Sequence, residues 1–252
     1  MQHFADPYSD EGLANARAQI EQAHPAALAV GQDCYLRLGC ILSAAEWERA
    51  SADEATHTLA ARVLELAATA LRCLRLGSVP SAKALTRAIL EATYKICAIK
   101  KEPSNLSQFI DDDIAARLLL NKQIHNYKKN KGSKSIAKGI EKKIDQLTLH
   151  KAKRIEPIEW ATRAEMLDFH WLFYPWLSSD IHSNAAAMNH YFVEDEEYTM
   201  ILGPSDVDLP MTLMILARCL NSAILALEGE QTESTTAWHA NVEERLRALE
   251  AK

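Results

Sequence analysis

The chain shows helical hydrophobic periodicity along nearly its whole length. Apolar residues recur three and four positions apart, which places them on one face of an α-helix, and the strict alternation typical of strands is rare. Glycine and proline, which interrupt helices, number only eight each among 252 residues. These features predict an all-α fold, a single multi-helix bundle over residues 1–252, and disfavour turn-rich all-β classes.

Glycine, proline and capping residues divide the periodic pattern into helices. Gly77 marks the end of the third helix, Pro80 the start of the fourth, and Ser104 precedes the fifth. The predicted helices cover 10–23, 25–48, 53–76, 80–101, 104–129, 134–152, 158–170, 175–190, 207–228 and 233–250. Residues 190–193 and 198–202 are strand-like instead, and the acidic segment between them is compatible with the turn of one short β-hairpin.

The composition favours a cytoplasmic protein. Hydrophobic residues make up 48% of the chain and charged residues 25%, as in ordinary globular proteins. The N-terminus has no basic segment followed by an apolar run, and the five cysteines form no C-x-x-C pair, so we expect neither a secretory signal nor disulfides. The most apolar segment, 209–227, contains Arg218, which would cost about 2.5–3.5 kcal/mol within a membrane. We therefore expect a core helix and no membrane partner.

Positive charge is concentrated in residues 121–154, which we expect to form a basic helical arm within the domain. This basic stretch has eleven Lys or Arg residues against two acids, a balance of +9, whereas the rest of the chain carries −15. Within it Ile136, Ile140, Ile144 and Leu147 form one apolar stripe, and lysines occupy the opposite face. The lysines that we single out as candidate contacts for RNA or an acidic protein partner are Lys128, Lys129, Lys134, Lys138 and Lys142. A solvated lysine surface is the simpler alternative, because no aromatic residues interleave the row.

The densest polar cluster in an apolar setting lies in residues 171–182. A helix that begins at Pro175 places Ser178 and His182 on one face, with Tyr174 just before them. A hydroxyl beside an imidazole can support general acid–base chemistry. The alternative is that His182 is a histidine at the edge of the core, hydrogen-bonded to Ser178.

A second polar cluster lies in the predicted helix 80–101. Arg87 and Glu91 share one stripe of this helix, in the order that gives the weaker helical ion pair. Arg218 also needs a partner, because a buried, unpaired guanidinium is costly. One hypothesis is an internal network of Arg87, Glu91, Arg218 and His182; a solvated Arg87–Glu91 pair is the alternative.

Signatures of the common enzyme classes are missing from the sequence. It contains no phosphate-binding glycine loop, no H-E-x-x-H and no G-x-S-x-G. We therefore expect no metal site and no cofactor, and the hydrolase, kinase and dehydrogenase classes are disfavoured.

The two polar clusters carry a resemblance to a known family. The chain resembles a large bacterial family of all-helical domains of unknown function through Arg-x3-Glu (Arg87 and Glu91) and Tyr-x3-Ser-x3-His (Tyr174, Ser178 and His182). The resemblance covers roughly residues 60–195 and implies that these five residues share a polar site.

A more distant likeness is to HEPN-type helical proteins, which include RNA-cleaving toxins and phage-defence effectors. It rests on their Arg–His spacing, which Arg163 and His170 match and which Arg17 and His24 match equally. It implies an RNA-cleaving effector. His182 has no Arg at that spacing, and in our hypothesis the catalytic residues of such an effector are His182, Ser178, Tyr174, Arg87 and Glu91.

Three functions remain open from the sequence. We favour a non-enzymatic interaction module with a buried polar network, whose basic arm docks an acidic protein; a homo-oligomer is among the alternatives. The second hypothesis is the RNA-cleaving effector. The third is a small-ligand pocket with Trp171, Tyr174 and Trp176 as walls.

Overall fold

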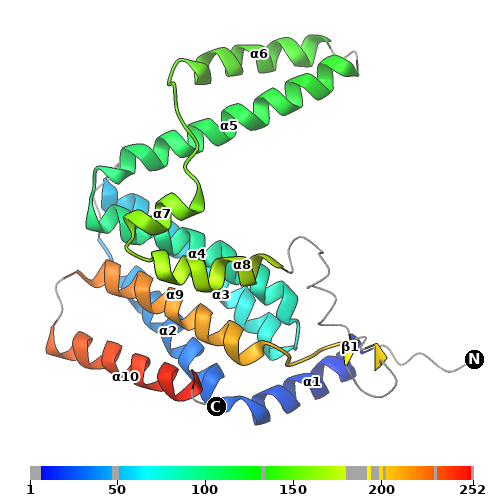
Figure 1. Cartoon of the computed structure of the whole chain (residues 1–252), viewed down its shortest axis with the longest axis vertical. Coiled ribbons are helices and arrows are strands. Elements are labelled where there is room, and N and C mark those ends of the chain that lie inside the picture. The colour runs from blue at the N-terminus through cyan, green and yellow to red at the C-terminus, as the bar shows by residue number, and fades with distance from the viewer. Residues whose placement is uncertain are drawn as a thin grey trace, which may run out of the picture.

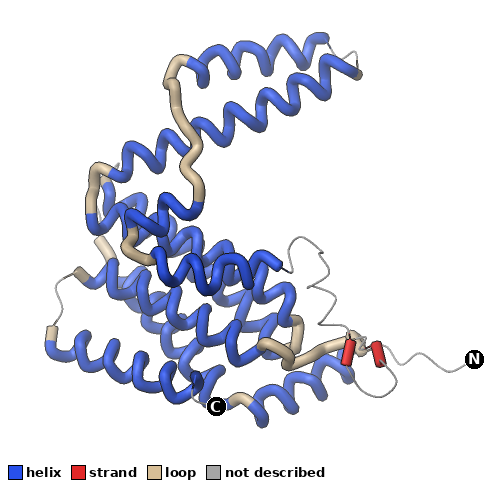
Figure 2. Tube along the Cα trace, in the orientation of Figure 1, coloured by secondary structure: helices blue, strands red, loops and turns tan. Residues whose placement is uncertain are grey.

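The computed structural model describes residues 7–46, 51–131, 134–179, 192–193, 199–200, 203–229 and 232–250. These residues form a body of packed α-helices from which one pair of helices projects (Figure 1, Figure 2). The all-α fold class predicted from the hydrophobic periodicity is confirmed.

Helices account for nearly all the regular structure among the described residues. They are α1 (Asp10–Ala23), α2 (Pro25–Ala44), α3 (Ala52–Arg75), α4 (Val79–Lys101), α5 (Asn105–Asn130), α6 (Lys134–Thr148), α7 (Pro157–Arg163), α8 (Leu167–Ser179), α9 (Leu209–Glu228) and α10 (Glu233–Glu250). Two short strands, β1 (Phe192–Val193) and β2 (Thr199–Met200), pair antiparallel with Phe192 opposite Met200.

The centre of the body is built around α4 and α9, and α2 and α3 pack against them. Thirteen side chains of α9 are buried, because the helix is apolar around most of its circumference. By length and composition α9 could also cross a membrane, but 67% of its most apolar segment is buried inside the protein. Its composition is therefore accounted for by its central position.

The remaining helices of the body cover this centre. α7 and α8 lie against α4, and α10 lies against α9 and α2. The Arg218 guanidinium of α9 binds two carboxylates of α10, with Nη1 3.0 Å from Glu243 Oε2 and Nη2 2.7 Å from Glu250 Oε1. The expected network of Arg218 with Arg87 is wrong, because α10 supplies the partners of Arg218.

The two helices α5 and α6 form a hairpin that projects from the body (Figure 1). No described side chain between residues 116 and 154 is buried. Ile140, Ile144 and Leu147 of α6 are half-buried against α5, and His125 Nε2 lies 3.3 Å from Glu141 Oε1 across the pair. The apolar stripe of α6 thus covers one side of α5. The base of the α5–α6 hairpin (residues 105–148) is buried at Asn105, Asp112 and Ala115, and beyond residue 115 the described residues that do not lie between the two helices face solvent.

The break between α7 and α8 differs most from the prediction. The sequence predicted helices over 158–170 and 175–190, but the helix is interrupted at residues 164–166, where Glu165 takes φ 56°. Pro175 consequently lies inside α8 and not at a helix start. The proline leaves the carbonyl of Trp171 without its helical donor, and Trp171 is on the exposed side of α8, where water can solvate that carbonyl.

Candidate functional site

Three of the predicted site residues meet between α4 and α8. Arg87 Nη2 donates to the Tyr174 hydroxyl at 2.7 Å, and Arg87 Nε donates to Glu91 Oε1 at 3.2 Å. The same hydroxyl donates to Glu91 Oε1 at 3.0 Å. The guanidinium also lies over the Tyr174 ring, 4.7 Å from its centroid. We call this closed set of three hydrogen bonds the Arg87–Glu91–Tyr174 triangle.

Burial and the Glu91 carboxylate together keep the Tyr174 hydroxyl protonated. Burial raises the pKa of Tyr174, the Glu91 carboxylate raises it further, and the hydrogen bond from Arg87 opposes both effects. A neutral phenol can accept from the guanidinium and donate to the carboxylate at the same time. Each member of the triangle therefore satisfies its two neighbours at the edge of the core, where the Arg87 and Glu91 side chains are 21% and 35% exposed.

A buried histidine lies beside the triangle. The His170 ring stacks on the Tyr174 ring with centroids 4.5 Å apart, and the Tyr94 ring is 5.8 Å away. Burial lowers the pKa of His170, partly offset by the Glu91 charge, so its imidazole is neutral at pH 7. His170 Nδ1 and the Tyr94 hydroxyl are buried and have no hydrogen-bond partner among the described residues. The sequence pointed to His170 only through its spacing from Arg163.

A buried lysine extends the site by one turn of α4. Lys83 Nζ lies 3.8 Å from the centroid of the Trp176 ring and 3.4 Å from Asp208 Oδ2, and its side chain is 2% exposed. A buried ammonium requires such partners, because its desolvation is otherwise costly. Lys83 and Arg87 together present two cations of α4 to the aromatic residues of α8.

The Ser178 hydroxyl forms a hydrogen bond within α8 and takes no part in the triangle. Ser178 Oγ donates to the Tyr174 carbonyl at 2.6 Å, the ordinary bond of a serine to the preceding turn. His182 lies outside the described residues. Arg163 is the arginine that matches the Arg–His spacing with His170. It donates to Asn105 and Gln108 of α5, and its guanidinium lies over the Trp160 ring.

The candidate lysines lie along the α5–α6 hairpin. Lys129, Lys138 and Lys142 are exposed, and Lys128 is half-buried with Nζ 5.9 Å from the centroid of the Tyr127 ring. Lys134 is the first residue of α6. The described lysines therefore present their charge to solvent around the hairpin.

Asp112 holds the base of the hairpin to the body, a role that the sequence did not reveal. Its carboxylate accepts from the Ile155 N–H at 3.0 Å and lies 3.1 Å from Arg154 Nη1 and 3.7 Å from Lys95 Nζ. These groups come from α4 and from the segment that follows α6, and Asp112 itself is 4% exposed. The only sequence signal was a run of three aspartates, 111–113, which does not distinguish the buried one.

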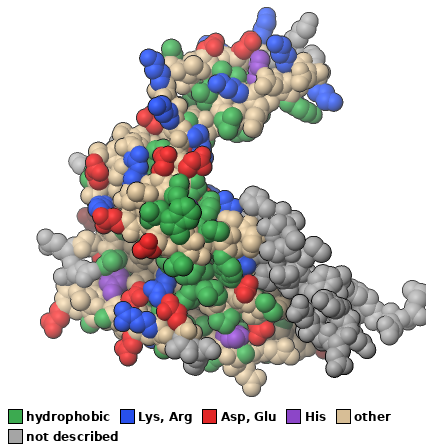
Figure 3. All heavy atoms as spheres, in the orientation of Figure 1, with side chains coloured by type: hydrophobic (Ala, Val, Ile, Leu, Met, Phe, Trp, Pro, Cys, Tyr) green, Lys and Arg blue, Asp and Glu red, His purple; other side chains and the backbone are tan. Residues whose placement is uncertain are grey.

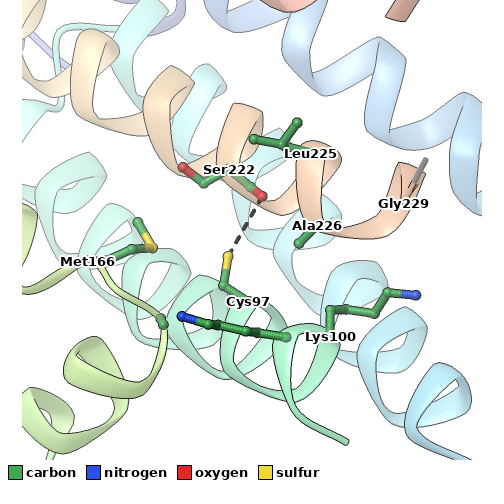
Figure 4. Close-up of a pocket in the computed structure, with 9 residues that line it drawn as sticks. Cys97, Lys100, Met166, Ser222, Leu225, Ala226 and Gly229 are labelled. Atoms are coloured by element: carbon green, nitrogen blue, oxygen red, sulfur yellow. Dashed lines mark hydrogen bonds between the residues drawn. The ribbon is translucent and has the colours of Figure 1, made fainter. Parts of the chain in front are cut away.

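Figure 4 shows a separate pocket of about 420 Å³ between α4 and α9. Cys97 Sγ lies 3.7 Å from the Ser222 carbonyl, and Lys100 at the rim pairs with Asp53 at 2.9 Å. Burial raises the pKa of Cys97 to about 12. Cys97 is therefore a thiol at neutral pH, and the pocket holds no activated nucleophile.

Comparisons with known proteins give one match. The model of the family described as "Family of unknown function (DUF5677)" matches residues 53–199, a span that includes α4, α8 and the α5–α6 hairpin. No curated protein and no solved structure matches. Among the described residues, no three His, Cys, Asp or Glu side chains are grouped to hold a metal ion.

Proposed function

The chain belongs to the Family of unknown function (DUF5677), and we propose that it is a non-enzymatic interaction module. In this proposal the α5–α6 hairpin docks an acidic partner, and the Arg87–Glu91–Tyr174 triangle fixes α8 on α4. We place the module in the cytoplasm, because all five cysteines are free thiols, as is usual in a reducing compartment.

The closed triangle is the observation that carries this proposal. Arg87 donates from Nε to Glu91 and from Nη2 to Tyr174, and the Tyr174 hydroxyl both accepts and donates within the set. Two of the five N–H donors of Arg87 are thereby engaged within the protein and are not free for a substrate phosphate. Polar groups that satisfy one another between two helices instead fix the register of those helices.

The test compares two hydroxyl deletions on α8. We expect Tyr174→Phe to lower the free energy of unfolding by about 1–2 kcal/mol, because Glu91 and Arg87 lose a partner. Ser178→Ala is the matched control and should change it by about 0.5 kcal/mol or less, because the carbonyl that Ser178 contacts lies in its own helix. Urea denaturation measures both. Equal, negligible changes would contradict a structural role of the triangle.

The second candidate function is a HEPN-like RNA-cleaving effector. It is favoured by two buried polar atoms near Tyr174 that lack partners among the described residues, His170 Nδ1 and the Tyr94 hydroxyl. In this alternative His182 is the acid–base residue, Ser178 and Tyr174 orient it, and Arg87 stabilises the phosphate charge, while the lysines of the hairpin hold the RNA backbone.

The two candidates are separated by one experiment. Wild type and His182→Ala are incubated with purified tRNA and total RNA, and the thermal midpoint of each protein is recorded. The interaction module predicts no cleavage by either protein. Cleavage by wild type alone, with matched midpoints, would establish a ribonuclease and overturn the module.

A further inference from the structure

The α5–α6 hairpin exposes a basic apolar surface. Leu120, Ile124 and Tyr127 are spaced four and three residues apart on α5, so they share one stripe, and they are 55%, 38% and 59% exposed. Lys128 and Lys131 follow Ile124 and Tyr127 by four residues, so they lie next to them on the same side of α5. Exposed apolar side chains that lie together in this way are typical of an interaction surface.

The body exposes an acidic apolar groove. It has a volume of about 460 Å³, lies between α8, α9 and α10, and has apolar walls that include Phe169, Leu172 and Phe173. Its charged residues are three carboxylates, Glu165, Asp168 and Glu250, and one guanidinium, Arg218. Glu165 pairs with Lys101 at the edge of the groove and Glu250 with Arg218, so the net charge of the lining is negative mainly through Asp168. Figure 3 shows hydrophobic side chains gathered on this face of the body, below the hairpin, with both acidic and basic side chains around them.

These two surfaces match each other but do not meet within one chain. Leu120 of the hairpin and Leu172 of the groove are 55% and 67% exposed in the same molecule, so neither covers the other. The basic stretch 121–154 carries +9 and the rest of the chain −15, so the hairpin of one copy is attracted to the body of another.

We propose that the groove receives the α5–α6 hairpin of a second copy of this chain. The exchange is reciprocal, because the copy that receives a hairpin also offers one, and two identical contacts then close a twofold-symmetric dimer. This inference rests on the proposed interaction module and specifies its partner.

A charge swap tests the pairing. The hairpin variant carries Lys128→Glu and Lys131→Glu, and the groove variant carries Glu165→Lys and Asp168→Lys. Each variant alone brings like charges together in both contacts, so we expect its dimer Kd to rise by about tenfold or more. In an equimolar mixture every contact is again between opposite charges, and dimer should re-form. Sedimentation velocity of wild type, each variant and the mixture measures this, with circular dichroism to show that each variant is folded.

The control is Glu65→Lys, an exposed reversal on α3 away from both surfaces, which should leave the dimer unchanged. A monomeric wild type would overturn the second copy as partner while leaving the interaction module in place. A wild-type dimer that neither variant weakens, or that the mixture fails to restore, would also overturn it. RNA cleavage would instead overturn the module, so the two failures are distinguishable.

Discussion

The helices α9 and α6 have clear apolar patterns and lie in opposite environments. Thirteen side chains of α9 are buried, whereas none of the described side chains of α6 is. α9 is apolar around most of its circumference, and α6 has a narrow apolar stripe opposite its lysines. The width of the apolar surface, and not the regularity of its spacing, therefore separates a central helix of the body from a helix with one covered side.

The largest expected effect is a direct test of this difference. Leu220 of α9 is 0% exposed and Leu120 of α5 is 55% exposed. We expect Leu220→Ala to lower the free energy of unfolding by about 2–5 kcal/mol, because it leaves a cavity in the core. Leu120→Ala should change it by about 0.5 kcal/mol or less at a concentration where the protein is monomeric. Urea denaturation followed by circular dichroism measures both, and similar losses would show that the hairpin is not free of the body.

The next effect concerns the attachment of the hairpin to the body. Asp112→Ala removes the acceptor of the buried Ile155 N–H and a partner of Lys95, and we expect a loss of about 1–3 kcal/mol. Asp113→Ala is the matched control, because Asp113 is 49% exposed and pairs only with Arg117 among the described residues; it should cost about 0.5 kcal/mol or less. Denaturation gives the energies, and hydrogen exchange of residues 116–154 reports whether the hairpin loosens. Equal losses in the two variants would contradict the role of Asp112.

The helices could be predicted from the sequence because their signals are local. The apolar spacing and punctuation such as Gly77 give most helix ends, and Gly77 takes φ 70° after α3, as a C-terminal cap requires. The break at 164–166 could not be predicted, since no glycine or proline marks it and Glu165 takes the left-handed conformation there. Pro175 has the sequence signature of a helix start, but it lies inside α8.

The candidate site could be predicted only in part, because its contacts join distant segments. Arg87 and Glu91 are four residues apart on one helix, but Tyr174 was joined to them by a family resemblance and not by any local pattern. Asp112 and His170 depend on how α5 and α8 pack on α4, and no spacing within their own helices expresses that packing. Ser178 follows Tyr174 by four residues, as the family motif requires, yet its hydroxyl donates to the backbone carbonyl of Tyr174.

The smallest expected effect is a dependence of protein stability on pH, which arises because His170 is buried in the body. Its pKa is lowered in the folded state, so the unfolded chain binds more protons below the ordinary value of about 6.5. Stability should therefore be complete above that pH and fall as the pH drops below it. His170→Phe keeps an aromatic ring against Tyr174 and removes the titrating group, so its stability should depend less on pH. Thermal midpoints of wild type and variant across this range measure the difference, and equal slopes would show that another group causes the loss.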